Sequence, residues 1–249
     1  MRHLPLIALA LFVGTSSACG QSATAKEIVD RAIKAQAEKP DDLAKRRIER
    51  IVMEGKITFG GDTPIVREII AEWPTRLRYN NTLKNPQGET RINFALNGDR
   101  GWRVGTEIPF EEYDLNKVDE FRAEAHGKWI ATLYPLRESS LNMVALPDNR
   151  LDNEAVQIVK VTARFRPDVL LFFSKNTGLL VKASYKTSES GAPVRKEHLF
   201  GDYKKFEGLL LPSKLADVQN GNRVAEYTVK EYKFLDKQPA GVFDKPSGK

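Results

Sequence analysis

The stretch Asp168-Val-Leu-Leu-Phe-Phe-Ser-Lys-Asn-Thr-Gly-Leu-Leu-Val-Lys-Ala-Ser-Tyr185 decides the fold. Two apolar runs rich in β-forming residues flank a Ser-Lys-Asn-Thr-Gly segment, in which Asn176 and Gly178 supply the backbone angles of a tight reversal. The stretch therefore predicts a β-hairpin. Its first strand is apolar on both faces, so one side must face a second layer or an enclosed cavity.

Alternating apolar and polar residues predict further antiparallel strands on both sides of this hairpin. We expect strands at 51–59, 65–73, 77–81, 90–96 and 102–104, and then at 156–165, 169–174, 179–186, 196–203, 209–218 and 223–234. Turn signals such as Asn97-Gly98-Asp99 separate them. Many short strands at regular spacing indicate a barrel or a strongly curved sheet.

Helical patterns occur at the N-terminus and in the middle of the chain. Thr24 opens a capping-box pattern before a helix to about residue 38, and a short second helix follows through residue 48. Residues 115–133 predict an amphipathic helix, with Glu124 on its polar side and a loosened turn at Gly127.

The first 20 residues have the layout of a secretory signal: Arg2, an apolar run and then small residues. Cys19 is the only cysteine and lies where a lipoprotein signal places its acylated residue, so either lipidation of Cys19 or its removal with the signal fits. Residues 21–249 are expected to form one domain. Removing the signal takes away Arg2 and no acidic residue, which lowers the net charge of +6 by one.

The remaining basic excess is mild and interleaved with acidic residues. It is compatible with an anionic membrane surface but not typical of a nucleic-acid-binding protein. No catalytic motif or metal-ligand cluster occurs in the sequence, and the histidines of the mature chain, His126 and His198, lie far apart. We expect both to be structural or exposed, and we predict a protein that is not an enzyme and needs no cofactor.

Apolar residues that would share the concave side of one curved sheet, or the helix that covers it, form the candidate ligand site. A single-sheet barrel covered by helices either fills with side chains or encloses an apolar ligand. The candidate residues are Met53, Ile57, Phe59, Ile69, Trp73, Phe94, Leu96, Phe121, Trp129, Leu133, Leu171 and Phe173. If Leu170 and Phe172 face inward instead of Leu171 and Phe173, the cavity remains but its lining changes.

Several of these segments resemble the LolA/LolB-like superfamily of bacterial outer-membrane lipoprotein-sorting proteins. The resemblance covers most of 25–246 and is carried by turns and strand edges: Gly55-Lys-Ile-Thr-Phe59, Trp73-Pro-Thr-Arg-Leu-Arg78, Asn97-Gly-Asp-Arg-Gly-Trp102, Phe173-Ser-Lys-Asn-Thr-Gly-Leu-Leu-Val-Lys182, Asp202-Tyr203, Leu211-Pro-Ser-Lys214 and Val242-Phe-Asp-Lys-Pro246.

The resemblance implies an α+β fold, in which a strongly curved antiparallel sheet forms a half-open barrel and helices cover its concave apolar face. Family carriers have a basic residue before the Pro that opens the third strand, where it helps to latch the lid. This chain has Trp73 at that position.

The resemblance also implies a function. We expect a non-enzymatic carrier of lipoprotein acyl chains or lipids, exported to the periplasm or lipid-anchored to the outer membrane of a Gram-negative-type bacterium. Its partners would be the lipid or lipoprotein acyl chain, and the membrane surface or envelope proteins. The alternative is a lipid-sensing module of envelope stress signalling that binds a membrane protein.

Overall fold

The computed structural model describes residues 23–58, 61–86, 88–137 and 140–246, and it is built around one large antiparallel sheet. The elements follow in the order α1 (Ala25–Gln36), η1 (Pro40–Arg47), β1 (Ile48–Ile57), β2 (Thr63–Glu72), β3 (Arg76–Asn85), β4 (Gly88–Asn97), β5 (Arg100–Gly105), β6 (Glu111–Glu112), α2 (Leu115–Ala131), η2 (Tyr134–Arg137), β7 (Asn142–Leu151), β8 (Glu154–Thr162), β9 (Val169–Ser174), β10 (Leu180–Glu189), β11 (Ala192–Phe206), β12 (Leu209–Gln219) and β13 (Asn222–Phe234).

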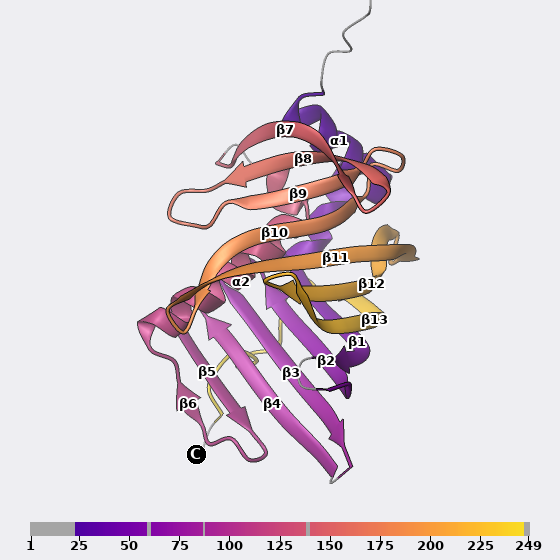
Figure 1. Cartoon of the computed structure of the whole chain (residues 1–249). Helices are drawn as coiled ribbons and strands as arrows, with labels where there is room; N and C mark the ends of the chain where they lie inside the picture. The colour runs from indigo at the N-terminus through magenta and orange to yellow at the C-terminus, as the bar shows by residue number, and fades with distance from the viewer. Residues whose placement is uncertain (1–22, 59–60, 87, 138–139, 247–249) are drawn as a thin grey trace, which may run out of the picture.

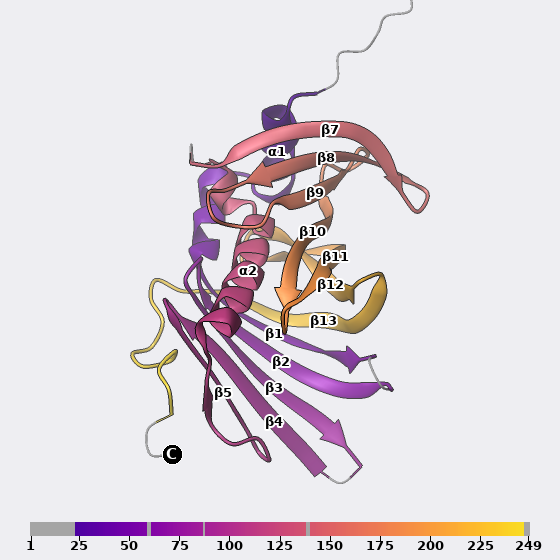
Figure 2. The ribbon, with the colours of Figure 1, turned by 60° about the vertical axis from the view of Figure 1, so that its left-hand side comes forward.

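The sheet is open and strongly curved, with the strand order β6-β5-β4-β3-β2-β1-β13-β12-β11-β10-β9-β8-β7. Strands β1 to β6 run steeply across the view of Figure 1, whereas β7 to β11 cross it almost horizontally. Helix α2 lies over the concave face between these two parts (Figure 2). The fold class inferred from the sequence, an open α+β barrel with helical cover, is confirmed.

Two-residue turns connect β10 to β11, β11 to β12 and β12 to β13. Ser190-Gly191, Glu207-Gly208 and Asn220-Gly221 have positive φ at both positions, with Asn220 at 50° and Gly221 at 86°. These are the angles of the type I′ turn, whose twist matches that of the strands it joins. The turn residues therefore explain why consecutive strands pair with one another from β10 to β13.

The predicted hairpin of residues 168–185 forms β9 and the first part of β10. Leu171 and Phe173 are fully buried, whereas Leu170 and Phe172 are half-buried. The inward phase of this strand is therefore that of Leu171 and Phe173. Phe173 lies opposite Leu180 across the ladder, and both belong to the main hydrophobic core.

Helix α1 begins with the predicted capping box. The Thr24 hydroxyl accepts a hydrogen bond from the Glu27 backbone N–H (3.2 Å), and the Glu27 carboxylate accepts one from the Thr24 backbone N–H (2.7 Å). Its apolar side contacts β7, β8 and β12. The second predicted helix is a 3₁₀-helix, η1, in which Lys39 makes no side-chain cap; short runs of this kind are typical of connectors.

Helix α2 is regular through Gly127, so the predicted loosening there is wrong. Gly127 instead lets the helix approach β10, because a Cβ at this position would lie 2.4 Å from Cε1 of Tyr185. The expected outward position of Glu124 is also wrong. Its carboxylate turns toward the sheet and accepts a hydrogen bond from the Tyr79 hydroxyl (2.7 Å).

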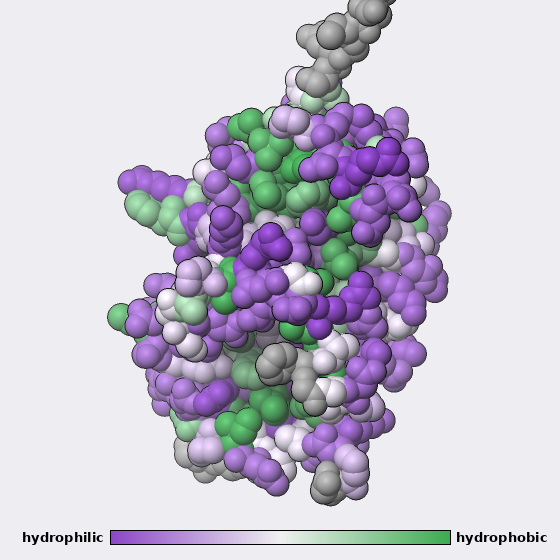
Figure 3. All heavy atoms as spheres, viewed as in Figure 1, coloured by the Kyte–Doolittle hydropathy of each residue, from purple (hydrophilic) through white to green (hydrophobic). Residues whose placement is uncertain are grey.

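Strands β6 and β7, the two edges, were not predicted from the sequence. β6 has only two residues, and β7 contains Pro147, Asp148 and Asn149, which weaken a strand pattern. Figure 3 shows that hydrophilic side chains cover most of the face seen in Figure 1, with apolar atoms gathered over the upper strands. Within the described part of the chain, no helix is both long enough and apolar enough to span a membrane.

Candidate functional site

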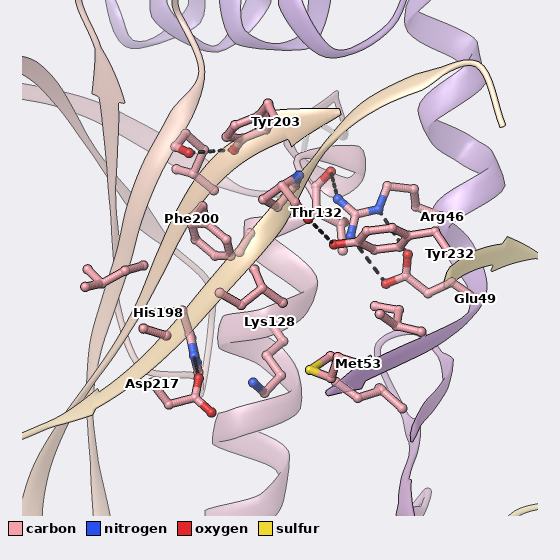
Figure 4. Close-up of a pocket in the computed structure, with 18 of the residues that line it drawn as sticks. Arg46, Glu49, Met53, Lys128, Thr132, His198, Phe200, Tyr203, Asp217 and Tyr232 are labelled. Atoms are coloured by element: carbon pink, nitrogen blue, oxygen red, sulfur yellow. Dashed lines mark hydrogen bonds and ion pairs between the residues drawn. The ribbon is translucent and has the colours of Figure 1, made fainter. Parts of the chain in front are cut away.

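A small cavity lies between α2 and the concave face of the sheet. Its volume is about 80 Å³, and α1, η1, α2 and strands β1, β2 and β10 to β13 all contribute to its wall. The wall is largely apolar, with Met53, Ile69, Phe200 and Leu215 among its side chains, but polar groups occupy both ends (Figure 4). The lining residues are Gln36, Arg46, Glu49, Ile51, Met53, Ile69, Trp73, Lys128, Ala131, Thr132, Leu180, His198, Leu199, Phe200, Tyr203, Pro212, Leu215, Ala216, Asp217 and Tyr232.

One end of the cavity is closed by a buried ion pair. Arg46 Nε donates to Glu49 Oε2 (3.0 Å), and the two side chains are only 9% and 1% exposed. Trp73 Nε1 donates to Glu49 Oε1 (2.9 Å), and Arg46 Nη1 donates to the backbone carbonyl of Thr132, which caps α2 (3.4 Å). A basic residue thus does reach the end of the covering helix, but it comes from η1, while Trp73 orients its carboxylate partner.

The other end of the cavity is marked by Asp217. Its carboxylate contacts His198 Nδ1 (2.7 Å) and Arg67 Nη1 (3.5 Å). Burial acts to raise the pKa of Asp217, but Lys128, His198 and Arg67 together hold that pKa well below its usual range. For His198, burial and the charge of Lys128 lower the pKa. Asp217 is therefore a carboxylate at neutral pH, and His198 is uncharged.

A second carboxylate, Glu124, links α2 to the sheet beside Asp217. It accepts the Tyr79 hydrogen bond from β3 and one from Lys196 Nζ on β11 (3.4 Å), and Lys128 Nζ lies 4.0 Å away. Burial acts to raise the pKa of Glu124, but Lys196, Lys128 and Tyr79 lower it to about 2. Glu124 thus fastens the covering helix to both halves of the sheet, through a hydrogen bond to β3 and an ion pair to β11.

Two further spaces adjoin the cavity at Asp217. A pocket of about 180 Å³ contains Arg67, Glu124 and Lys196, and a groove of about 600 Å³ contains Ile57, Arg67 and Tyr227. Asp217 borders the cavity, the pocket and the groove alike. The charged end of the cavity is therefore its side toward the molecular surface, and the Arg46 end is its inner side.

The structure brings three of the predicted ligand-site residues together in this cavity: Met53, Ile69 and Trp73. Leu96, Leu133, Leu171 and Phe173 are fully buried in the core. Phe121 packs against the rings of Phe94, Tyr79 and Tyr113. Ile57 borders the surface groove, and Trp129 lies in a separate pocket on the far side of α2. Phe59 and Cys19 lie outside the described residues.

The charged residues of the site were not predicted from the sequence. Arg67 and Asp217 lie on strands where an alternating pattern assigns polar side chains to solvent, and Glu124 lies among helix residues that are polar by type. The one available signal was that these charges fall on otherwise apolar faces: Arg67 alternates with Ile65 and Ile69. Among the described residues, no three His, Cys, Asp or Glu side chains gather as metal ligands.

Comparison with solved structures identifies the fold. A LolA superfamily protein from Nitrosomonas europaea matches with a TM-score of 0.52 and 13% identity over 90% of this chain and 99% of its own. A putative outer membrane lipoprotein-sorting protein domain from Vibrio parahaemolyticus matches with a TM-score of 0.50 and 11% identity over 87% of this chain and 97% of its own. No protein-family model and no curated protein sequence matches the chain.

The chain therefore has a LolA-like fold. The resemblance stated from the sequence is confirmed at the level of the fold, although the identities of 11–13% are too low to carry the function of those proteins to this one.

Proposed function

We propose that this protein is a non-enzymatic carrier that binds an acyl chain or lipid beneath α2. The observation that carries the proposal is the apolar cavity between α2 and the concave face, with Met53 and Ile69 in its wall and a charged entrance at Asp217. An amphiphile fits such a site: its chain lies along the apolar wall and its polar end meets the charges of Arg67, Lys128 and Lys196.

Binding requires α2 to move outward. The cavity of about 80 Å³ is smaller than the roughly 300–1,000 Å³ of typical ligand pockets. Each buried methylene contributes roughly 0.8 kcal/mol, so ten contribute about 8 kcal/mol. The ion pair of Glu124 with Lys196, which joins α2 to β11, has side chains that are 20–22% exposed and contributes about 1 kcal/mol or less, and the Tyr79 hydrogen bond to Glu124 adds about 1–3 kcal/mol. Chain burial is therefore large enough to offset these polar contacts, and the bound chain would replace part of the apolar contact that α2 gives up when it moves.

Mass spectrometry of lipids that copurify with the exported protein tests this function. Ile69→Trp fills the cavity and should remove most of the bound lipid, whereas Val144→Trp, at a 44% exposed position on β7, is the matched control. Thermal melts confirm that both variants fold. A wild-type protein without lipid, or equal lipid in the two variants, would refute the carrier proposal.

An exported location goes with this function. We infer that the protein works in the periplasm or anchored to the outer membrane through Cys19. A Cys19→Ala variant of the full chain should move from the membrane fraction to the soluble fraction if Cys19 is acylated, and an unchanged distribution would indicate plain secretion.

The second candidate is a lipid-sensing module that binds an envelope protein, and the edge strand β7 favours it. β7 pairs with β8 on one side only, so its other edge presents backbone groups to which a partner strand can add. Cross-linking in cells should then capture a membrane protein through β7, and Val144→Pro, which cannot extend the ladder, should abolish the cross-link. A cross-link that survives Val144→Pro would exclude this mode.

A further inference from the structure

A second pocket, separate from the cavity, lies on the opposite side of α2. Its volume is about 290 Å³, and it is lined by α2, the β2–β3 turn, the β4–β5 turn, residues 140–141 before β7 and the loop between β8 and β9. The β8–β9 loop projects from the body of the molecule at the left of Figure 1 and of Figure 3. The pocket is open to solvent beside this loop.

The pocket is strongly basic. Arg122 of α2 and Arg164 and Arg166 of the loop line it, and among the described lining residues there is no Asp or Glu. Arg122 has one carboxylate neighbour outside the pocket, Asp119 (3.0 Å), whereas the loop arginines make no ion pair within the described part of the chain. Guanidinium groups gathered with no Asp or Glu in the described part of the lining favour an anion, above all a phosphate group.

A buried histidine in the same pocket has an unused hydrogen-bonding atom. His126 is only 3% exposed, it lines the pocket, and its Nε2 has no hydrogen-bond partner among the described residues. A buried polar atom without a partner is unfavourable, so such atoms in folded proteins usually meet a ligand or water. A neutral imidazole with its proton on Nε2 would donate to an anion held by the arginines once the atoms that cover Nε2 move aside.

An exposed aromatic side chain stands at the tip of the same loop. Phe165 lies between the two loop arginines, is 82% exposed, and has a positive φ of 59° that turns the chain outward. The Arg164 guanidinium lies 4.5 Å from the centre of its ring. A protruding aromatic flanked by basic residues suits the interface of an anionic bilayer, where the ring enters the acyl region and the arginines meet headgroups.

We propose that this pocket binds a phosphate group, presented by an anionic phospholipid at a membrane surface into which Phe165 inserts. The site would dock the protein on a bilayer with α2 next to the membrane. It does not depend on a lipid in the cavity, because the cavity and this pocket share no lining residue.

Binding to phosphatidylglycerol vesicles tests the lipid source. Arg164→Ala/Arg166→Ala should weaken vesicle binding roughly tenfold or more, since each arginine near an anionic surface contributes about a factor of five. The matched control is Arg91→Ala/Arg150→Ala, which removes the same charge from exposed positions outside the pocket. Phe165→Ser should also weaken binding, and phosphatidylcholine vesicles should bind poorly. Equal binding by the two double variants would overturn the proposal.

Titration with inorganic phosphate tests the pocket itself. Phosphate should shift the NMR signals of the His126 ring and the Trp129 indole in the wild-type protein, and both shifts should vanish in Arg164→Ala/Arg166→Ala. If vesicles bind but phosphate leaves His126 unshifted, the pocket is not the site and the proposal fails. If phosphate binds but phosphatidylglycerol vesicles do not, the ligand is a soluble phosphate compound and the membrane assignment is wrong. If Phe165→Ser leaves vesicle binding unchanged, Phe165 does not insert and that part of the proposal fails.

Discussion

For Gly127→Ala, two physical effects predict opposite changes in the stability of the protein. Alanine has a higher helix propensity than glycine by about 1 kcal/mol, so an isolated helix would be stabilised. In this protein the new Cβ would lie 2.4, 2.7 and 2.9 Å from Cε1, Cδ1 and Cζ of Tyr185. These contacts are with a ring that is 2% exposed, so the ring has little room to move, and overpacking of this kind costs about 1–3 kcal/mol.

We therefore expect Gly127→Ala to leave the protein unchanged or destabilised by up to about 2 kcal/mol, with a fall in Tm of about 2–4 °C per kcal/mol. Urea unfolding measures the free energy. In a Tyr185→Ala background the ring is absent, so the same change should become stabilising by about 1 kcal/mol.

Gly201→Ala is the matched control, because the nearest atom to its added Cβ is 4.0 Å away and its φ is not positive. It should cause no loss of stability. If Gly127→Ala stabilises the wild-type protein as much as it stabilises the Tyr185→Ala variant, α2 is not held against β10 by this contact. If α2 is held against β10 by the contact of Gly127 with Tyr185, Gly127→Ala should also exchange bound lipid faster, because α2 would then lie farther from the sheet.

Three further results are expected. Arg46→Ala should reduce the free energy of unfolding by about 3–5 kcal/mol, because it leaves Glu49 buried and unpaired. The double variant Arg46→Met/Glu49→Leu removes both charges and should recover most of the loss. If it recovers nothing, the unpaired charge of Glu49 is not the cause of the destabilisation. Thr24→Ala should cost about 1 kcal/mol in the same urea assay by removing the cap of α1, against no change for exposed Ser188→Ala. Burial and the Arg166 charge lower the pKa of His126 from 6.5 to about 4, so the unfolded chain binds more protons than the folded protein between these pH values. The free energy of unfolding should therefore be highest above pH 6.5 and fall by up to about 3 kcal/mol toward pH 4. If the free energy of unfolding falls no more steeply with pH in the wild type than in His126→Gln, this prediction is refuted.

The sequence predicted those elements whose signal is local. The capping box at Thr24 and the hairpin turns at Gly98-Asp99 and Asn220-Gly221 depend on residues only two or three positions apart, and the structure contains them. The inward phase of β9 could not be decided, because Leu170 to Phe173 are all apolar, and only packing separates the two pairs.

The charged part of the site depends on contacts across the sheet, which no local pattern reports. Glu124 turns inward because Lys196 on β11 and Tyr79 on β3 meet it there, and these residues are 72 and 45 positions away. The buried pair of Arg46 and Glu49 is close in sequence, but its burial depends on Trp73 and on the end of α2. The periodicity of apolar residues therefore predicted part of the apolar wall of the cavity, but not the charged residues at its two ends.

The pairing of β1 with β13 has a consequence for how the chain folds. Strands β1 to β6 and β7 to β13 are two meanders whose contacts are between neighbours in sequence, and one ladder joins them, with Ile57 opposite Ala225. Closing so long a segment is entropically unfavourable, although the penalty grows only slowly with length. Since long-range pairings form slowly, the β1–β13 ladder should form last, after β13 has been synthesised. Until then each meander exposes an unpaired edge strand, and a chaperone that covers β1 or β13 would protect the nascent protein from aggregation.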